Sequence, residues 1–497
     1  MNPATAYTGG GSKISSSAST HKDPIRRKRQ VVFARALSDD SVVYVGSNLG
    51  RFYAIDRDGQ LLWEYLPWQP NPFLASIVVP SPIGSPVQAV ATPIVGGAVL
   101  PRTVPYVIFG DLDGNLYALD RETGEEVWAV AANPHPLGGI VGNSLLVVGD
   151  TLYVGFASLE NLGLVLGAYG YPCCSHQGAV AAFDVRTGAE LWRTLTSPDA
   201  VQPLDPALSP HQLGPSGADI WGQPTYDEES NTLFVATGQN FSPNGEGEGT
   251  AMSDAVIALD ADSGAIKWHY QATENDIWNV GVATPDENGV YYDQDFGDSP
   301  KIYELEGIGK VVGLGQKSGE YHVVEAATGE LIASTLHAPM ANALGGFQNL
   351  GAMAHDRIFQ HGLSRIGPPG SPLFDGVVVA LSPDGVDELW RFDERFLAPL
   401  AGGLAVANDV IYLVSPGAFP VDPAWFPGEF IKFQPSLLAL DARTGELLHE
   451  IDLAGEAVSS PVIVDGRVYA GEGNTAIADL GVDESGGLVA FGLPGDD

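Results

Sequence analysis

The sequence predicts an all-β protein folded as an eight-bladed β-propeller, and three observations lead to that fold class. First, a motif recurs in which a strand, an Asp-x-x-Thr-Gly turn and a second strand ending in Trp follow one another. Its first four aspartates, Asp56, Asp120, Asp184 and Asp260, lie 64 to 76 residues apart. Second, another alternating apolar run precedes each motif, so each repeat supplies four short strands, the unit of a propeller blade. Third, 61 glycines and 36 prolines among 497 residues suit short strands and tight turns.

Eight copies of the motif can be followed along the chain, and they vary mainly at their ends. Most copies end in Trp, one ends in two leucines, one lacks the Trp and the last copy is truncated. The endings are Trp63, Trp128, Trp192, Trp268, Trp390 and Leu447-Leu448, with the Trp-less copy at residues 323–329 and the truncated copy at residues 488–491. We expect strands around residues 31–33 to complete the last blade and close the ring. We interpret the repeated Asp, Gly and Trp positions as turn and inter-blade packing residues.

The chain divides into a tail and one domain. Residues 1–29 are rich in Ser and Gly and end in a basic run, which predicts a disordered N-terminal tail. Residues 30–497 are predicted to form a single eight-bladed propeller domain. Extra length between Asp184 and Asp260, and again at residues 415–434, predicts long loops over one face of the propeller.

The composition excludes several classes of function. Acidic side chains number 61 and basic ones 24, a net charge of −37, and such a surface repels nucleic acids and anionic membranes. No apolar run approaches the length of a membrane span, and the chain as given shows no secretory signal. The two cysteines, Cys173 and Cys174, are adjacent and fit neither a covalent haem motif nor a zinc site. The residues alone leave two states open for this pair, free thiols or an eight-membered disulfide ring.

Residues that break the repeat pattern are the candidates for function, because propellers build their sites at the mouth of the central channel from loops and inner strand ends. Five segments depart from the pattern and carry acidic, aromatic or basic side chains. They are residues 155–160, residues 171–178, residues 217–226 with 235–240, residues 275–279 with 293–297, and residues 315–319.

These segments resemble the quinoprotein alcohol dehydrogenases, eight-bladed propellers that hold pyrroloquinoline quinone (PQQ) together with a divalent cation. Within that superfamily the chain is most similar to the polyvinyl alcohol dehydrogenase-like branch. The shared motifs are Tyr-Pro-Cys-Cys-Ser, Ile-Trp-Gly-x-Pro-Thr-Tyr-Asp, Ala-Thr-Gly, Ile-Trp-Asn and Asp-x-Asp-Phe-Gly, in this order along residues 40–495. The resemblance implies a quinoprotein alcohol dehydrogenase-like propeller that oxidises alcohol groups, including polymeric or secondary alcohols, to carbonyls. It also implies an external electron acceptor such as a c-type cytochrome, and a periplasmic or secreted location.

The resemblance further implies which residues hold the cofactor and the cation. Trp221 matches the tryptophan under the PQQ ring, a vicinal disulfide between Cys173 and Cys174 would be the rigid group on the other side, and Ser158 joins the cofactor-binding set. Glu160 matches the glutamate that binds the cation, either Ca²⁺ or a lanthanide, which acts as a Lewis acid on the quinone. Two further oxygen donors are expected nearby. These are Gln239, which stands where family members usually carry Asn, and Asn240 as its substitute.

The catalytic groups follow from the same resemblance and from strand geometry. Lys317 matches the cation aimed at the quinone oxygens, where it would stabilise developing negative charge. Many family members carry Trp-Asp where this chain has Trp-Asn279, and Asn cannot take a proton. Asp293 and Asp295, spaced by two on a strand, point to one face, so one is expected to act as the base while the other joins the cation shell. Asp276 is the alternative base.

Two further functions stay open. The repeats alone are shared by non-catalytic assembly propellers, so a propeller that kept the fold and acts as a binding or assembly scaffold is the alternative to the enzyme. A glycan-binding propeller is the third possibility, but the sequence lacks a periodic set of exposed aromatic residues for it. Gln177 stands where the most similar relatives tend to carry Arg, and residues 346–350 lack a Trp expected near the pocket.

Overall fold

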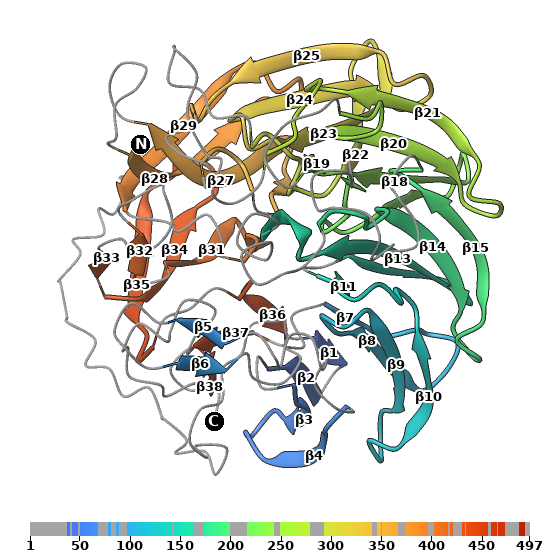
Figure 1. Ribbon diagram of the computed structural model, residues 1–497. Helices are drawn as coiled ribbons and strands as arrows, with labels where there is room; N and C mark the ends of the chain where they lie inside the picture. Colours follow the sequence, from blue (N-terminus) through green and yellow to red (C-terminus); the bar gives the residue numbers. More distant parts are fainter. Residues whose placement is uncertain are drawn as a thin grey trace, which may run out of the picture.

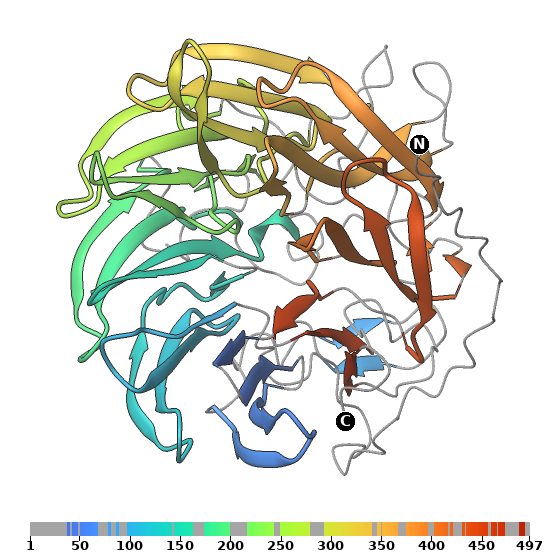
Figure 2. The same cartoon turned by 180° about the vertical axis from the view of Figure 1, so that it is seen from behind.

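The protein folds as a ring of antiparallel β-sheets arranged like the blades of a propeller (Figures 1 and 2). The computed structural model describes residues 37–39, 42–47, 50–67, 78–80, 86–88, 97–141, 144–162, 173–198, 216–242, 249–278, 293–339, 345–348, 350–365, 374–395, 402–415, 418–420, 430–432, 434–455, 459–464, 466–472 and 487–492. The predicted tail and the strand expected around residues 31–33 lie outside these residues, as does most of each long loop.

Eight sheets form the blades, and among the described residues six of them have four strands, blade 3 has five and blade 8 has three. Blade 1 is β1 (Leu37–Asp39), β2 (Val42–Gly46), β3 (Phe52–Asp56) and β4 (Leu61–Tyr65). Blade 2 is β7 (Ala98–Val99), β8 (Tyr106–Gly110), β9 (Asn115–Asp120) and β10 (Glu126–Ala131). Blade 3 is β12 (Leu145–Val148), β13 (Thr151–Ser158), β14 (Ala179–Asp184) and β15 (Glu190–Leu195), with β11 (Gly138–Gly139) paired to the end of β13. Blade 4 is β17 (Thr225–Asp227), β18 (Thr232–Ala236), β20 (Ala255–Asp260) and β21 (Ile266–Gln271).

The second half of the ring repeats the same topology. Blade 5 is β22 (Lys301–Leu305), β23 (Gly309–Gly315), β24 (Glu320–Glu325) and β25 (Leu331–Leu336). Blade 6 is β26 (Ala352–Ala354), β27 (Arg357–Arg365), β28 (Phe374–Leu381) and β29 (Glu388–Arg395). Blade 7 is β30 (Ala405–Ala407), β31 (Val410–Ser415), β34 (Ser436–Asp441) and β35 (Leu447–Asp452). Blade 8 has three strands among the described residues, β36 (Val462–Val464), β37 (Arg467–Glu472) and β38 (Gly487–Phe491).

Short ribbons decorate this ring. They are β5 (Val78–Pro80) with β6 (Pro86–Gln88), β16 (Ser216–Gly217) with β19 (Asn240–Phe241), and β32 (Ala418–Pro420) with β33 (Phe430–Lys432). A single 3-10 turn, Glu160–Leu162, follows β13, and the part of the chain that the structure describes contains no α-helix. In that part no helix has the length and apolar character needed to cross a membrane.

The repeated Trp and Gly residues join neighbouring blades, which confirms their interpretation as packing residues. Trp63 donates its indole N–H to the Arg121 carbonyl of blade 2 at 2.9 Å. A Cβ on Gly124 would stand 2.6 Å from the Trp63 ring, and Gly124 has a φ of 72° that glycine adopts without strain. The same pairing recurs between Trp128 and Gly188, Trp192 and Gly264, Trp268 and Gly329, and Trp390 and Gly445.

The hydrophobic core lies between blades, and one part of it closes the ring. Val43 and Val45 of β2 pack with Val462 and Tyr469 of blade 8 in one buried cluster. This contact joins the first and last blades, which lie at opposite ends of the sequence, and so closes the ring. The prediction of an all-β, eight-bladed propeller is therefore confirmed.

Candidate active site

Glu160 is fully buried, and its carboxylate holds the turn that carries the cysteine pair. Its oxygens accept the backbone N–H of Ser175 at 2.9 Å and that of His176 at 2.8 Å, and the hydroxyl of Ser216 donates to Oε2 at 2.9 Å. His135 Nε2 lies 3.8 Å from Oε1. Burial, and then the nearby His176, lowers the pKa of His135 to about 3, so the His135 side chain is neutral at physiological pH.

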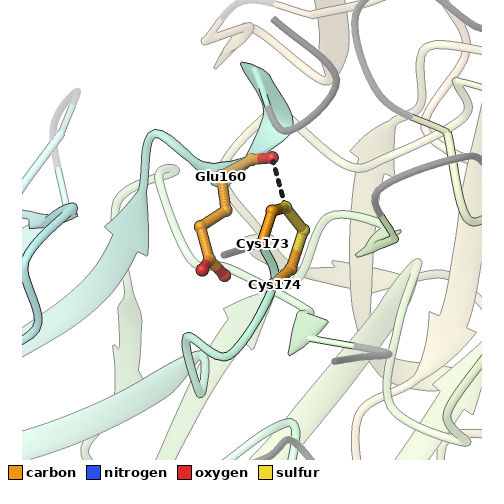
Figure 3. A group of neighbouring side chains, drawn as sticks. All are labelled: Glu160, Cys173 and Cys174. Atoms are coloured by element: carbon orange, nitrogen blue, oxygen red, sulfur yellow. Dashed lines mark hydrogen bonds between the residues drawn. A yellow bond between two sulfur atoms is a disulfide. The ribbon is translucent and has the colours of Figure 1, made fainter. Parts of the chain in front are cut away.

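Cys173 and Cys174 form a vicinal disulfide directly beside Glu160, as Figure 3 shows. The expectation of a disulfide is thereby confirmed. The Cys173 sulfur lies 3.8 Å from the Glu160 carbonyl oxygen; because a disulfide sulfur carries no proton, this is a contact and not a donated hydrogen bond. Both cysteines are fully buried. Since neither sulfur is a thiolate, the pair is not a soft-metal centre in this state, although its atoms lie close to the carboxylate.

A buried His–Asp pair lies next to this turn. His176 Nδ1 is 2.9 Å from Asp219 Oδ1, and Asp219 Oδ2 accepts both the backbone N–H of Ser158 at 2.6 Å and its hydroxyl at 3.1 Å. Burial by itself lowers the pKa of His176, but the Asp219 carboxylate and then Glu160 raise it, and the raising effects prevail. Ser158 therefore has a hydrogen-bonding role in positioning Asp219, which sequence reasoning did not identify.

Lys317 is the centre of a second group of side chains. Its ammonium lies 2.9 Å from Asp293 Oδ1 and 2.8 Å from Asp295 Oδ1, the latter as an ion pair without hydrogen-bond alignment. The same ammonium is 5.9 Å from the ring centre of Trp221 and 5.8 Å from that of Trp278. Burial lowers the pKa of Lys317, but the two carboxylates raise it further than burial lowers it, so the ammonium stays charged.

Two more carboxylates surround this group. Asp276 Oδ1 accepts the backbone N–H of Trp278 at 3.1 Å and Oδ2 that of Gln294 at 2.6 Å. Burial raises the pKa of Asp276 to about 7, against these hydrogen bonds. Asp254 is fully buried, and neither of its oxygens has a hydrogen-bond partner among the described residues. The Lys317 ammonium is thus paired with Asp293 and Asp295, and its charge also lowers the pKa of Asp276.

A bridging segment, residues 216–221, joins the two groups. Its first residue, Ser216, contacts Glu160, and its last, Trp221, contacts Lys317. Between them, the Ile220 N–H donates to the Phe156 carbonyl of blade 3 at 3.0 Å. On the other side, the Ala218 N–H donates to the Gln239 carbonyl at 2.8 Å. The segment is therefore fixed to both blades that it connects.

The remaining predicted residues lie around this segment. The Gln239 amide donates to the Trp278 carbonyl at 3.4 Å, and the Asn240 amide donates to the Ser216 carbonyl at 2.8 Å while its oxygen accepts from Thr250. Gln177 donates to the Pro198 carbonyl at 3.0 Å. Asn279 lies outside the described residues.

The structure thus brings Trp221, Lys317, Asp293 and Asp295 into direct contact range. Glu160 and the cysteine pair are joined to them through the bridging segment. Sequence reasoning missed Asp219, His176 and Asp254 as members of the site, although the first two lie inside the segments 217–226 and 171–178 that depart from the repeat. Asp254 carried a signal that could have been found, because it stands at a repeat position where most other blades have glycine.

Two family models match different parts of the chain. The family model described as glucose/ethanol/alcohol dehydrogenase, β-propeller domain, matches residues 164–343. The model described as outer membrane protein assembly factor BamB matches residues 5–194 and 375–489. The chain belongs to the superfamily of quinoprotein alcohol dehydrogenase-like propellers.

Individual proteins in this superfamily are similar over most of the chain. A polyvinylalcohol dehydrogenase of Sphingopyxis sp. (strain 113P3) is 27% identical over 430 residues, 80% of this chain. The chain spans 62% of that relative's length. The solved quinohemoprotein alcohol dehydrogenase ADHIIG from Pseudomonas putida HK5 has a TM-score of 0.67 at 20% identity, with 95% of this chain and 75% of that chain covered. A europium-containing methanol dehydrogenase has a TM-score of 0.63 at 18% identity, with coverage of 89% and 82%.

Proposed function

We propose that this protein is a PQQ- and cation-dependent dehydrogenase that oxidises alcohol groups to carbonyls. The observation that carries the proposal is the Lys317 ammonium, which lies between the carboxylates of Asp293 and Asp295 and within 6 Å of two tryptophan rings. A flat, negatively charged quinone is matched by an aromatic face and a fixed cation. The names of the relatives support the same reaction class.

The residues present fit both absent groups. Asp254, Asp293 and Asp295 carry buried carboxylate oxygens without a hydrogen-bond partner among the described residues, and such oxygens are the ligands that hard cations prefer. Trp221 offers a ring face for PQQ, the Cys173–Cys174 disulfide a rigid uncharged surface, and Lys317 a charge for the quinone oxygens. When bound, PQQ supplies the acceptor for the two electrons of the alcohol.

Asp293 is the proposed base that removes the hydroxyl proton of the alcohol. Burial raises the pKa of Asp293 well above its ordinary value; Lys317 opposes this rise, and the charges of Asp295 and Asp276 add to it. A carboxylate with a raised pKa is a stronger proton acceptor, so the position suits general-base work. Because Asp293 acts only when ionised, turnover is expected to increase with pH through the raised pKa. Asp276 remains the alternative base.

The finer features of the function belong to the same proposal. The substrate is a polymeric or secondary alcohol, the electrons pass to an external acceptor such as a c-type cytochrome, and the cation is Ca²⁺ or a lanthanide. The protein works in the periplasm or outside the cell, where a disulfide is stable. Residues 30–497 are proposed to form its one domain, and the predicted tail, residues 1–29, lies outside the described residues.

Reconstitution tests this function. The purified protein is incubated with PQQ and either Ca²⁺ or a lanthanide, and PQQ binding is followed by quenching of tryptophan fluorescence. Dye reduction is then measured with primary, secondary and polymeric alcohols. We expect saturable quenching and cation-dependent dye reduction, both weakened in Trp221→Ala. Absence of PQQ binding under every cation condition would refute the proposal.

A scaffold function is the second candidate, and the match to the assembly-factor model favours it. A scaffold would bind neither PQQ nor cation and would instead bind a partner protein through a blade edge. The same fluorescence titration distinguishes the two, because a scaffold gives no quenching with PQQ at any cation concentration.

A further inference from the structure

Asp254 occupies a backbone position that most other repeats of the propeller give to glycine. It comes one residue before β20, and the equivalent residues of other blades are Gly50, Gly114, Gly178, Gly319 and Gly376. Asp254 has a φ of 48°, in the left-handed region, as Gly50, Gly114 and Gly319 also do. The carbonyl of Asp254 accepts the Ala272 N–H at 2.9 Å, just as the Gly319 carbonyl accepts the His337 N–H. The backbone at this position therefore favours glycine, and repeat packing gives no reason for a carboxylate.

The Asp254 carboxylate is also unpartnered. The residue is fully buried, and both of its oxygens lack a hydrogen-bond partner among the described residues. Buried polar groups are nearly always paired, so such an oxygen requires an explanation. The neighbouring Ser253 hydroxyl acts against the rise in the pKa of Asp254, but it brings no positive charge to the carboxylate.

The charges that act on Asp254 are the other carboxylates of the site. Its backbone N–H donates to the Gly238 carbonyl at 3.0 Å, and a Cβ on Gly238 would stand 3.1 Å from Asp295 Oδ2. Gly238 therefore lies between the two aspartates. After burial, the strongest influences on the Asp254 carboxyl are the charges of Asp276, Asp295 and Asp293, all of which raise its pKa. The electrostatics thus place Asp254 in the same acidic group.

The Lys317 ammonium does not form an ion pair with Asp254 among the contacts of the described residues. The Lys317 ammonium is paired with Asp293 and Asp295 at 2.9 and 2.8 Å, and the Asp276 oxygens accept backbone N–H groups. An unpaired buried carboxylate is strongly destabilising unless a proton or a cation neutralises it. Several carboxylate oxygens from different chain segments form the ligand set of a hard, oxygen-seeking cation.

We propose that Asp254 is a ligand of the cation in this site, together with the carboxylate of Asp295. The proposal deepens the proposed function, on which the pairing of this cation with PQQ rests. Asp254 would then add one more charged oxygen donor to the ligands expected from the sequence, which are Glu160, Gln239 and Asp295.

Terbium luminescence tests this role without PQQ and without turnover. The full-length protein is stripped of metal with a chelator and titrated with Tb³⁺, whose emission is sensitised by nearby tryptophans such as Trp221 and Trp278. We expect one saturable site in the wild type and at least about tenfold weaker binding in Asp254→Asn, because ligand charge sets cation affinity. Asn tolerates the left-handed backbone. Asp262→Asn, on the exposed turn at the other end of β20, is the matched control and should bind like the wild type.

A second variant keeps the test decisive if Asp254→Asn folds poorly. Asp254→Gly restores the residue that other blades carry, so it should fold well and melt at a higher temperature than the metal-free wild type. Added Ca²⁺ should raise the melting temperature of the wild type and of Asp262→Asn, but not that of Asp254→Gly.

The outcomes distinguish this inference from the proposed function. Unchanged Tb³⁺ affinity in both Asp254 variants would overturn the inference, even if PQQ binds. A wild type that binds neither Tb³⁺ nor Ca²⁺ would overturn it as well, since a proton would then neutralise the carboxylate. Cation binding that depends on Asp254 without any PQQ binding would support the inference and count against the proposed function alone.

Discussion

Gly297 is the residue whose substitution tests most directly whether the position of Trp221 matters. It ends the Asp-x-Asp-Phe-Gly motif, and a Cβ on it would stand 2.2 Å from Trp221 Cη2 and 2.3 Å from the Gln348 carbonyl oxygen. Both distances are more than an ångström shorter than the ordinary contact of 3.4–4 Å. The carbonyl oxygen belongs to the backbone, so in Gly297→Ala the indole must yield. We therefore expect Trp221 to move away from Lys317.

The expected magnitude follows from this overlap. Overpacking of a filled site costs about 1–3 kcal/mol of folding stability, and lost stacking on an aromatic ring costs about 0.5–1.5 kcal/mol of binding. Gly297→Ala should thus lower the free energy of unfolding by about 2 kcal/mol and weaken PQQ binding by roughly tenfold. Denaturant titration measures the first effect and fluorescence quenching by PQQ the second.

Gly487→Ala is the matched control, because the nearest atom to its added Cβ is 3.9 Å away. It should change neither stability nor PQQ affinity. If Gly297→Ala is as stable as this control and binds PQQ equally well, the indole is not held by this contact and the reasoning fails.

Three further predictions concern charge and closure. In Asp219→Asn, the loss of stability should be larger near pH 6 than near pH 9 in pH-dependent thermal unfolding. Because the folded protein raises the pKa of His176, the protonated His176 stabilises the wild type fully when the pH is below the ordinary pKa of 6.5. This contribution is lost as the pH rises through the raised pKa. An equal loss of stability at both pH values would contradict the prediction. Lys317→Met should lower steady-state turnover about 10²-fold or more and shift its pH profile to higher pH, because the base loses its nearest positive charge; an unshifted profile would exclude this role. Deleting residues 1–29 should leave the unfolding midpoint unchanged. Deleting residues 1–36 should lower the free energy of unfolding by at least about 2 kcal/mol, because the sequence predicts around residues 31–33 a strand that completes blade 8. Equal midpoints for both truncations would show that blade 8 closes without this segment.

The ring itself could be predicted from sequence because each blade repeats the same turn and the same packing against its neighbour. Trp63 and Gly124 lie in consecutive repeats, and the spacing that places one against the other is visible as a period in the chain. Residues 31–33, expected to close blade 8, lie outside the described residues, so that part of the prediction stays open. The packing of Val43 against Tyr469 shows the closure between blades 1 and 8 directly.

The site could be predicted only in part, because its groups are defined by contacts between segments far apart in the chain. Lys317 meets both Asp293 and Asp295, but the strand on which the sequence argument placed them was wrong, because residues 293–297 lie in an irregular segment before β22. The pairing of Asp219 with His176 bridges 43 residues and has no periodic signal. The state of Glu160 was equally hidden, since a glutamate motif does not reveal that backbone N–H groups already occupy its oxygens.

The bridging segment explains why residues that depart from the repeat are found together. A repeat position is free to change only where inter-blade packing does not use it, and residues 216–221 are fixed instead by backbone hydrogen bonds to Phe156 on one side and to Gln239 on the other. Once both ends are held in this way, Ser216 can contact Glu160 and Trp221 can contact Lys317 without disturbing either blade. Asp254 differs from this segment because it lies within the repeat. It keeps the backbone contacts of the repeat, and only its side chain differs from the glycine of most other blades. The candidate site thus consists of residues whose backbone satisfies the packing of the propeller while their side chains differ from the repeat.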